Sequence, residues 1–66
     1  MKKQFKVEEM HCNHCVESID KALKDVEGIE NIDIDLDSKI VSLEGEVDDE
    51  KVIESLDEIG FDAVSL

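Results

Sequence analysis

The sequence predicts an α+β fold in the order βαββαβ, in which a four-stranded antiparallel sheet carries two helices on one face. Two stretches have apolar residues at helical spacing, and stretches of alternating apolar and polar residues flank them. An internal echo links the two halves, because residues 16–20 read Val-Glu-Ser-Ile-Asp and residues 53–57 read Ile-Glu-Ser-Leu-Asp. Two β-α-β halves interlocked in this way form a split β-α-β sandwich.

The first half is expected to contain a strand, a loop with both cysteines, and a helix. Phe5 and Val7 alternate with charged residues, which indicates a strand over residues 2–8. The helix follows the cysteine loop, and we expect Gly28 to end it. Its apolar stripe consists of Val16, Ile19, Leu23 and Val26.

The second half is expected to contain a hairpin, a helix and a final strand. A short turn at residues 37–39 joins the two strands of the hairpin, and acidic residues 48–50 suit a helix start because a helix N-terminus favours negative charge. Gly60 is expected to end this helix. The apolar residues assigned to these elements are Ile32, Ile34 and Leu36, then Val41 and Leu43, then Val52, Ile53, Leu56 and Ile59, and in the last strand Phe61, Ala63 and Leu66.

Length and charge restrict the function. A chain of 66 residues suits one domain, 1–66, which hides only about 60% of its unfolded surface and leaves no room for a deep substrate cavity. We therefore expect a binding or carrier module and not an enzyme. Nineteen Asp and Glu against seven Lys and Arg give a net charge of -12, which argues against a nucleic-acid partner. A protein partner with a basic patch would complement this charge, or the acidity serves solubility alone.

The chain has no apolar run near the ~20 residues of a membrane span, so no membrane insertion is expected. Residues 1–5 are basic but lack the apolar stretch of a signal peptide, which predicts a soluble, cytoplasmic protein. In that compartment a Cys-x-x-Cys pair is more often metal-binding or redox-active than a structural disulfide.

The two cysteines, Cys12 and Cys15, stand three residues apart where the first helical pattern begins. The first turn of a helix brings residues at this spacing together, and its unpaired amides and dipole favour negative charge. A helix start therefore lowers a thiol pKa and favours the thiolate, which either ligates soft metals or attacks disulfides. The pair is thus a candidate metal site or a candidate redox site.

Metal binding is the first interpretation. Two thiolates select Cu(I), Zn(II) or another thiophilic ion, and a closed zinc site needs four ligands. His11 and His14 could complete such a set, but neighbouring residues of a loop rarely project toward one point. Cu(I) needs fewer ligands, and an under-coordinated site can accept a third sulfur from a partner and pass the ion on. The second interpretation is a dithiol redox protein. The short chain and the hairpin after the first helix weigh against it.

Two further residues lie near the expected site. Met10 precedes Cys12 by two positions, and we expect it to plug into the core and anchor the loop, although its sulfur is an alternative ligand. Phe61 is expected at the same end of the sheet, where it either shields the sulfurs from water or fills the core. We expect His14 to face solvent.

The Met10-x-Cys12-x-x-Cys15 motif, the six-element order and the segment 60–63 resemble heavy-metal-associated (HMA) domains, and above all the small bacterial cytosolic copper chaperones. The resemblance covers essentially the whole chain and implies a ferredoxin-like fold in which Cys12 and Cys15 bind Cu(I). Three residues depart from the family pattern: Glu9 stands where Gly is common, His11 replaces Thr or Ser, and Phe61 replaces a Tyr common in the bacterial copper chaperones.

The resemblance also implies partners. Copper would be delivered to the metal-binding domain of a copper-transporting P-type ATPase and in some members to a copper-responsive repressor, and a copper-bridged homodimer can form. Zn or Hg binding is the alternative within the family. We expect a free-standing protein and not a fragment of the ATPase.

Overall fold

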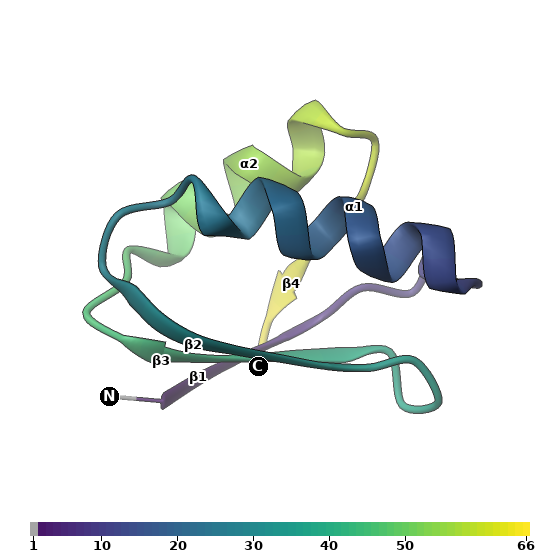
Figure 1. Cartoon of the computed structure of the whole chain (residues 1–66), viewed down its shortest axis with the longest axis horizontal. Coiled ribbons are helices and arrows are strands. Elements are labelled where there is room, and N and C mark those ends of the chain that lie inside the picture. Colours follow the sequence, from purple (N-terminus) through teal and green to yellow (C-terminus); the bar gives the residue numbers. More distant parts are fainter. Residues whose placement is uncertain (1) are drawn as a thin grey trace.

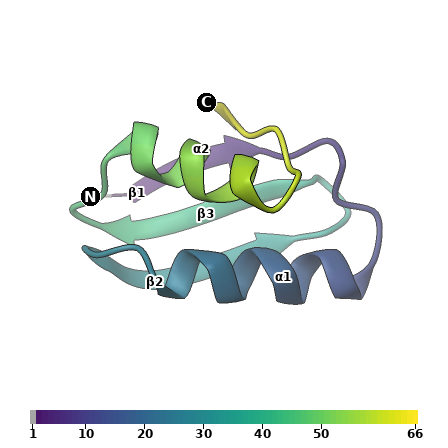
Figure 2. The same ribbon diagram turned by 90° about the horizontal axis from the view of Figure 1, so that it is seen from above.

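The sheet is the layer on which the rest of the molecule is assembled. In the computed structural model, which describes residues 2–66, the elements are β1 (Lys2–Lys6), α1 (Asn13–Lys24), β2 (Ile29–Asp35), β3 (Ile40–Gly45), α2 (Asp49–Glu58) and β4 (Val64–Ser65). The strands lie in the order β2-β3-β1-β4, and every neighbouring pair is antiparallel. Both helices cover the same face of the sheet (Figures 1 and 2). The predicted βαββαβ sandwich, a ferredoxin-like fold, is confirmed.

The core lies between this sheet face and the two helices. Alternation places Phe5 of β1 opposite Val41 of β3, and both side chains are fully buried. Each helix contributes two residues of its predicted apolar stripe, since Ile19, Leu23, Val52 and Leu56 are fully buried as well. A single cluster of this kind is the main source of stability in a small domain, where about 25 cal/mol is gained per Å² of apolar surface removed from water.

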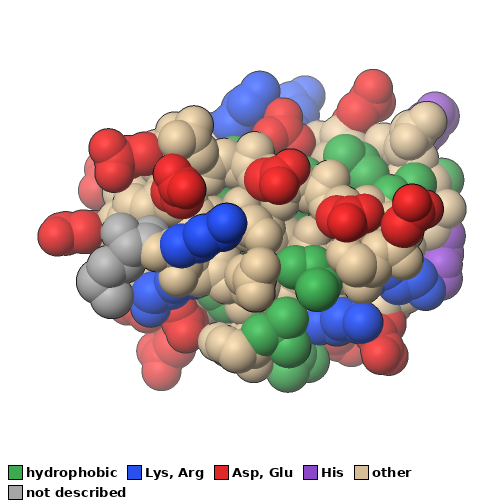
Figure 3. Space-filling model, turned by 90° about the horizontal axis from the view of Figure 1, so that it is seen from below, with side chains coloured by type: hydrophobic (Ala, Val, Ile, Leu, Met, Phe, Trp, Pro, Cys, Tyr) green, Lys and Arg blue, Asp and Glu red, His purple; other side chains and the backbone are tan. Residues whose placement is uncertain are grey.

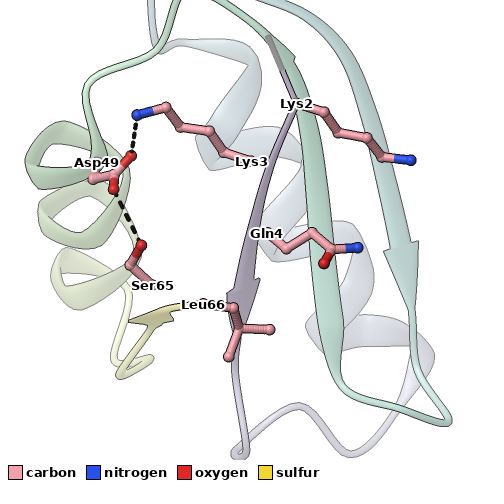
Figure 4. A pocket seen from close by; sticks show the side chains of 6 residues that line it. All are labelled: Lys2, Lys3, Gln4, Asp49, Ser65 and Leu66. Atoms are coloured by element: carbon pink, nitrogen blue, oxygen red, sulfur yellow. Dashed lines mark hydrogen bonds and ion pairs between the residues drawn. The ribbon is translucent and has the colours of Figure 1, made fainter.

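One polar cross-link joins β1, α2 and β4 (Figure 4). The Nζ of Lys3 donates to Asp49 Oδ1 at 2.7 Å, and Ser65 Oγ donates to Asp49 Oδ2 at 3.1 Å. The Lys3 ammonium is the main reason that the pKa of Asp49 is lowered. A lowered folded-state pKa adds stability above the unfolded pKa and loses it as pH falls through the folded one. The pair is partly exposed, so its contribution is small.

The first strand and the first helix are shorter than predicted. β1 ends at Lys6, and Val7 is buried just beyond it. The Val7 amide still donates to the Lys39 carbonyl at 2.9 Å, but the Val7 carbonyl accepts from the Met10 amide at 3.2 Å as the chain turns into the loop. α1 ends at Lys24 and does not reach Val26 or Gly28. The Val26 amide bonds the Leu23 carbonyl three residues back at 3.0 Å, which is a tightened last turn that closes the helix early.

The last strand differs most from the prediction. Phe61 and Ala63 precede β4, which contains only Val64 and Ser65, although Leu66 still donates to the Gln4 carbonyl at 2.9 Å. The amides that would form a longer ladder are used elsewhere. Those of Gly60 and Phe61 bond carbonyls of α2, at 3.0 Å to Asp57 and 2.9 Å to Leu56, and Gly60 has a φ of 90°. This is a Schellman motif, which ends α2 and fixes where Phe61 leaves it.

The hairpin also shifts by a few residues. β2 begins at Ile29, and Leu36 lies in the turn that follows Asp35 and not in the strand. A bulge between Ile29 and Asn31 accompanies a close backbone crossing, where a Cβ on Gly45 would meet the Gly28 carbonyl oxygen. Only glycine fits such a contact at a φ of 128°.

The uncovered sheet face is mixed in character (Figure 3). Acidic and basic side chains are scattered over it, with apolar patches among them, and the histidines lie at one end. Val64 and Leu66 are its large exposed apolar side chains near the β4 edge. Within the described residues, the structure contains no helix with the length and apolar character of a membrane span.

Candidate metal site

The cysteine loop leads directly into α1. Cys12 is the N-cap residue, with extended backbone angles (φ -151°, ψ 171°), and its carbonyl accepts from the Cys15 amide at 3.1 Å and the Val16 amide at 3.2 Å. Its side chain makes no capping bond, so helix formation leaves the sulfur available. Cys15 is the third residue of the helix, and one turn therefore brings the two side chains to the same end.

The two sulfurs face one small volume at the surface. Cys12 Sγ and Cys15 Sγ lie 3.5 Å apart, and both cysteines are free thiols. The Cys12 side chain is exposed and Cys15 is half-buried against the core. The site is therefore open to a partner on the Cys12 side and supported by protein on the Cys15 side.

Met10 anchors the loop to the core, as predicted. Its side chain is fully buried in the core, and its amide donates to the Val7 carbonyl at 3.2 Å. A thioether packed in this way fills apolar space and fixes the start of the loop. This burial favours the anchoring role over direct ligation.

The histidines do not complete a closed ligand set. His11 and His14 are both exposed, as expected for His14. Within residues 2–66, no group of three or more His, Cys, Asp or Glu side chains is arranged to hold a metal ion. The arrangement is thus two sulfurs with an open coordination sphere, unlike the four ligands of a structural zinc site.

The thiol pKa of Cys15 is lowered from its ordinary value, which is the predicted direction. The largest cause is the backbone amide of His11, followed by the hydrogen bond with the Cys12 side chain, while burial acts in the opposite direction. Hydrogen bonds to the charged form of a group favour that form. The loop backbone therefore favours the thiolate form of Cys15.

This shift predicts the pH dependence of Cys15 alkylation. The iodoacetamide rate of Cys15 in the reduced, metal-free protein should rise at a lower pH than that of an unstructured cysteine peptide, because the thiolate is the reacting form. Peptide mass spectrometry after timed quenching separates Cys15 from Cys12. A midpoint at or above that of the peptide would contradict the geometry described for the loop.

One contact at the base of the loop was not predicted from the sequence. The carboxylate of Glu9 accepts a hydrogen bond from the backbone amide of Asp62 at 2.7 Å, across 53 residues of sequence. The bond connects the cysteine loop to the segment between α2 and β4, where Phe61 is half-buried and packs on the core. The one signal in the sequence was the charged residue at a position where the related family commonly has Gly.

Comparison with known proteins shows the family of the chain. The heavy-metal-associated domain family matches residues 4–62. The copper chaperone CopZ of Enterococcus hirae is 30% identical over 66 residues, which cover 96% of each chain. The superoxide dismutase 1 copper chaperone of Debaryomyces hansenii is 38% identical over 55 residues, or 83% of this chain, and the matched part spans only 22% of that relative's length.

A solved structure supports the same conclusion. A copper-binding domain from HMA7, a P-type ATPase, superposes with a TM-score of 0.91 at 28% identity, covering 98% of this chain and 92% of that one. A ferredoxin-like domain with an open pair of thiols at the start of its first helix is a metal-binding domain of the copper-chaperone kind. The chain belongs to the heavy-metal-associated domain family.

Proposed function

We propose that the chain is a Cu(I) metallochaperone, a single domain over residues 1–66 that acts in the cytoplasm and has no catalytic turnover of its own. Cys12 and Cys15 are its metal ligands. The observation that carries the proposal is the pair of free sulfurs 3.5 Å apart without a third ligand from the described chain. Thiolates are soft ligands that suit Cu(I), and the cytoplasm keeps them reduced.

Delivery follows from the open coordination of the pair. Both thiols lose their protons to solvent when the ion binds, giving two Cu–S bonds. A partner thiolate then forms a third bond from the exposed side, the bond to one cysteine of this chain breaks, and the freed thiolate takes up a proton. A second exchange completes the transfer. Copper remains Cu(I) throughout, so no electron moves and no oxidant is needed.

The exposure of the two sulfurs suggests an order for these steps. Cys12 is the exposed ligand, so a partner sulfur reaches the ion on that side, and Cys12 is released first. Cys15 is half-buried and its thiolate is favoured by the His11 amide, so it holds the ion until the second exchange. The bond to the half-buried Cys15 thiolate thus keeps the ion from dissociating into water.

The proposed recipient is the metal-binding domain of a copper-transporting P-type ATPase. The support is the structural likeness to such a domain and the name of the CopZ relative. A net charge of -12 suits a recipient with a basic docking patch. A copper-responsive repressor is a second recipient by family resemblance, and two copies bridged by copper would use the same exposed sulfurs.

A dithiol redox protein is the second candidate function. The observation in its favour is that two free thiols lie close together and one has a lowered pKa, which also suits thiol-disulfide exchange. It predicts catalysed reduction of a disulfide substrate and weak metal binding. Zn or Hg carriage by the same two thiolates is the alternative within metal binding.

The test is copper transfer by contact. The Cu(I)-loaded chain is mixed anaerobically with a copper-binding domain of a P-type ATPase, the two are separated by anion exchange, and copper is measured in each. We expect rapid redistribution on mixing and almost none when a dialysis membrane separates the proteins. Equal rates in both arrangements would indicate release to water and contradict the proposal. If acidic steering contributes, transfer slows as salt passes ~0.1 M, where the screening length is about 10 Å.

A further inference from the structure

We propose that Glu9 is a positioning residue that latches the cysteine loop to the segment between α2 and β4 and thereby slows the loss of bound copper. Only the effect on copper loss rests on the proposed function. The latch itself is the hydrogen bond from the Asp62 amide to Glu9 Oε1 at 2.7 Å. It joins two loops that lie at the same end of the molecule (Figures 1 and 2).

Besides the buried Met10 side chain, three hydrogen bonds hold the cysteine loop at its base. The Val7 amide bonds the Lys39 carbonyl at 2.9 Å, and the Met10 amide bonds the Val7 carbonyl at 3.2 Å. These two backbone contacts tie the loop to the turn before β3 and close it on itself. The Glu9 carboxylate accepts the third of these hydrogen bonds, and it is the one of the three that involves a side chain.

The other end of the latch is also held in place. The Phe61 amide is bonded to Leu56 at 2.9 Å by the Schellman motif, and Ala63 is nearly buried two residues later. The Asp62 amide lies between these fixed points and points its hydrogen at the carboxylate. A hydrogen bond to an ionised carboxylate is shorter and stronger than one between neutral groups. The bond can therefore transmit the position of one loop to the other.

The latch affects Cys15, the half-buried cysteine of the site. Glu9 precedes the buried Met10, and Met10 precedes Cys12 by two residues, so movement at Glu9 reaches the sulfurs through a short, anchored segment. Without the latch, the loop and the Phe61 segment move independently, and Cys15 is less protected from solvent and from competing ligands. The expected result is faster release of the ion with the ligands unchanged.

Three variants separate the latch from simple charge effects. Glu9→Ala removes the acceptor, Glu9→Gln keeps an acceptor oxygen but removes the charge, and Glu8→Ala removes the same charge from the neighbouring exposed residue. The measurements are amide hydrogen exchange at Asp62, the iodoacetamide rate of Cys15 in the metal-free protein, and the rate at which a copper chelator takes Cu(I) from the loaded protein.

We expect Glu9→Ala to increase all three rates, by roughly threefold to tenfold, the range of a typical net hydrogen bond, because exposure to solvent weakens the contribution of the carboxylate charge. Glu9→Gln should retain most of the Asp62 protection, and Glu8→Ala should resemble the wild type. Unchanged Asp62 exchange in Glu9→Ala would overturn the latch. Equal copper release from Glu8→Ala and Glu9→Ala would also overturn it, because charge alone would then explain the effect.

The metal-free measurements keep this inference separate from the proposed function. If the wild-type chain failed to bind Cu(I), the proposed function would fail. The Asp62 exchange and the Cys15 alkylation rate would still show whether Glu9 positions the loop. If both were unchanged in Glu9→Ala while copper bound normally, the latch alone would be wrong.

Discussion

Replacing either Cys12 or Cys15 by serine should weaken Cu(I) binding by more than about 100-fold. Loss of a residue that only hydrogen-bonds a metal ligand already lowers metal affinity by up to about 100-fold, and loss of the ligand itself should cost more. Serine offers a hard, protonated oxygen in place of a soft thiolate, and the described chain has no third side chain in position to take over. Affinity is measured by anaerobic titration against a Cu(I) chelator. Because the chain has no Trp or Tyr, thiolate-to-copper absorption is little obscured in the ultraviolet.

Asn13→Ser is the matched control for this loss. Asn13 lies between the two cysteines, is exposed, and begins α1, so the variant places serine in the same turn while both sulfurs remain. It should bind Cu(I) within a few-fold of the wild type. Retained tight binding in both cysteine variants would show that the ion is held elsewhere, and the two-thiolate site would then be wrong.

Gly45→Ala should destabilise the fold by about 3 kcal/mol or more, against a total of about 5 kcal/mol for a core of this size. Two costs add at this position. The φ of 128° is strained for any residue with a Cβ, and that Cβ would meet the backbone carbonyl of Gly28, which cannot move without disturbing the hairpin. Urea unfolding followed by circular dichroism measures the loss.

Gly60→Ala separates these two costs. Gly60 also has a positive φ, 90°, but an added Cβ there meets no atom within 4 Å. This variant should lose only about 1–2 kcal/mol, the strain term alone. If Gly45→Ala were no worse than Gly60→Ala, the close crossing between residues 28 and 45 would not be as tight as described.

Element order and core were predictable because they follow from local periodicity. The alternation around Phe5 and Val41 and the helical spacing of Ile19, Leu23, Val52 and Leu56 each express burial on one face, and all of these residues are buried. The ends of the elements were less predictable. α1 stops at Lys24 and β4 is reduced to two residues because amides near these ends bond to carbonyls of the preceding turn, which periodicity does not record.

The site, like the fold, has features that follow from local sequence and features that depend on tertiary packing. The spacing of Cys12 and Cys15 predicted the paired sulfurs, because one turn of helix brings them together. Their place at a helix start predicted the direction of the Cys15 pKa shift, but the largest cause of that shift is the His11 backbone, which precedes the helix. The burial of Met10 followed from its apolar character in an otherwise polar loop. The Glu9–Asp62 bond did not, because it joins residues 53 apart in sequence and depends on how α2 ends. Contacts of this kind are set by tertiary packing and have no local signature.

The most direct test of the central claim is a titration of the wild-type chain with Cu(I) in the presence of excess Zn(II), under anaerobic conditions and with a chelator to buffer each ion. An open pair of thiolates predicts that one Cu(I) binds per chain and that Zn(II), which lacks its four ligands here, does not displace it. Displacement of Cu(I) by Zn(II), or no tight binding of Cu(I) at all, would contradict this account.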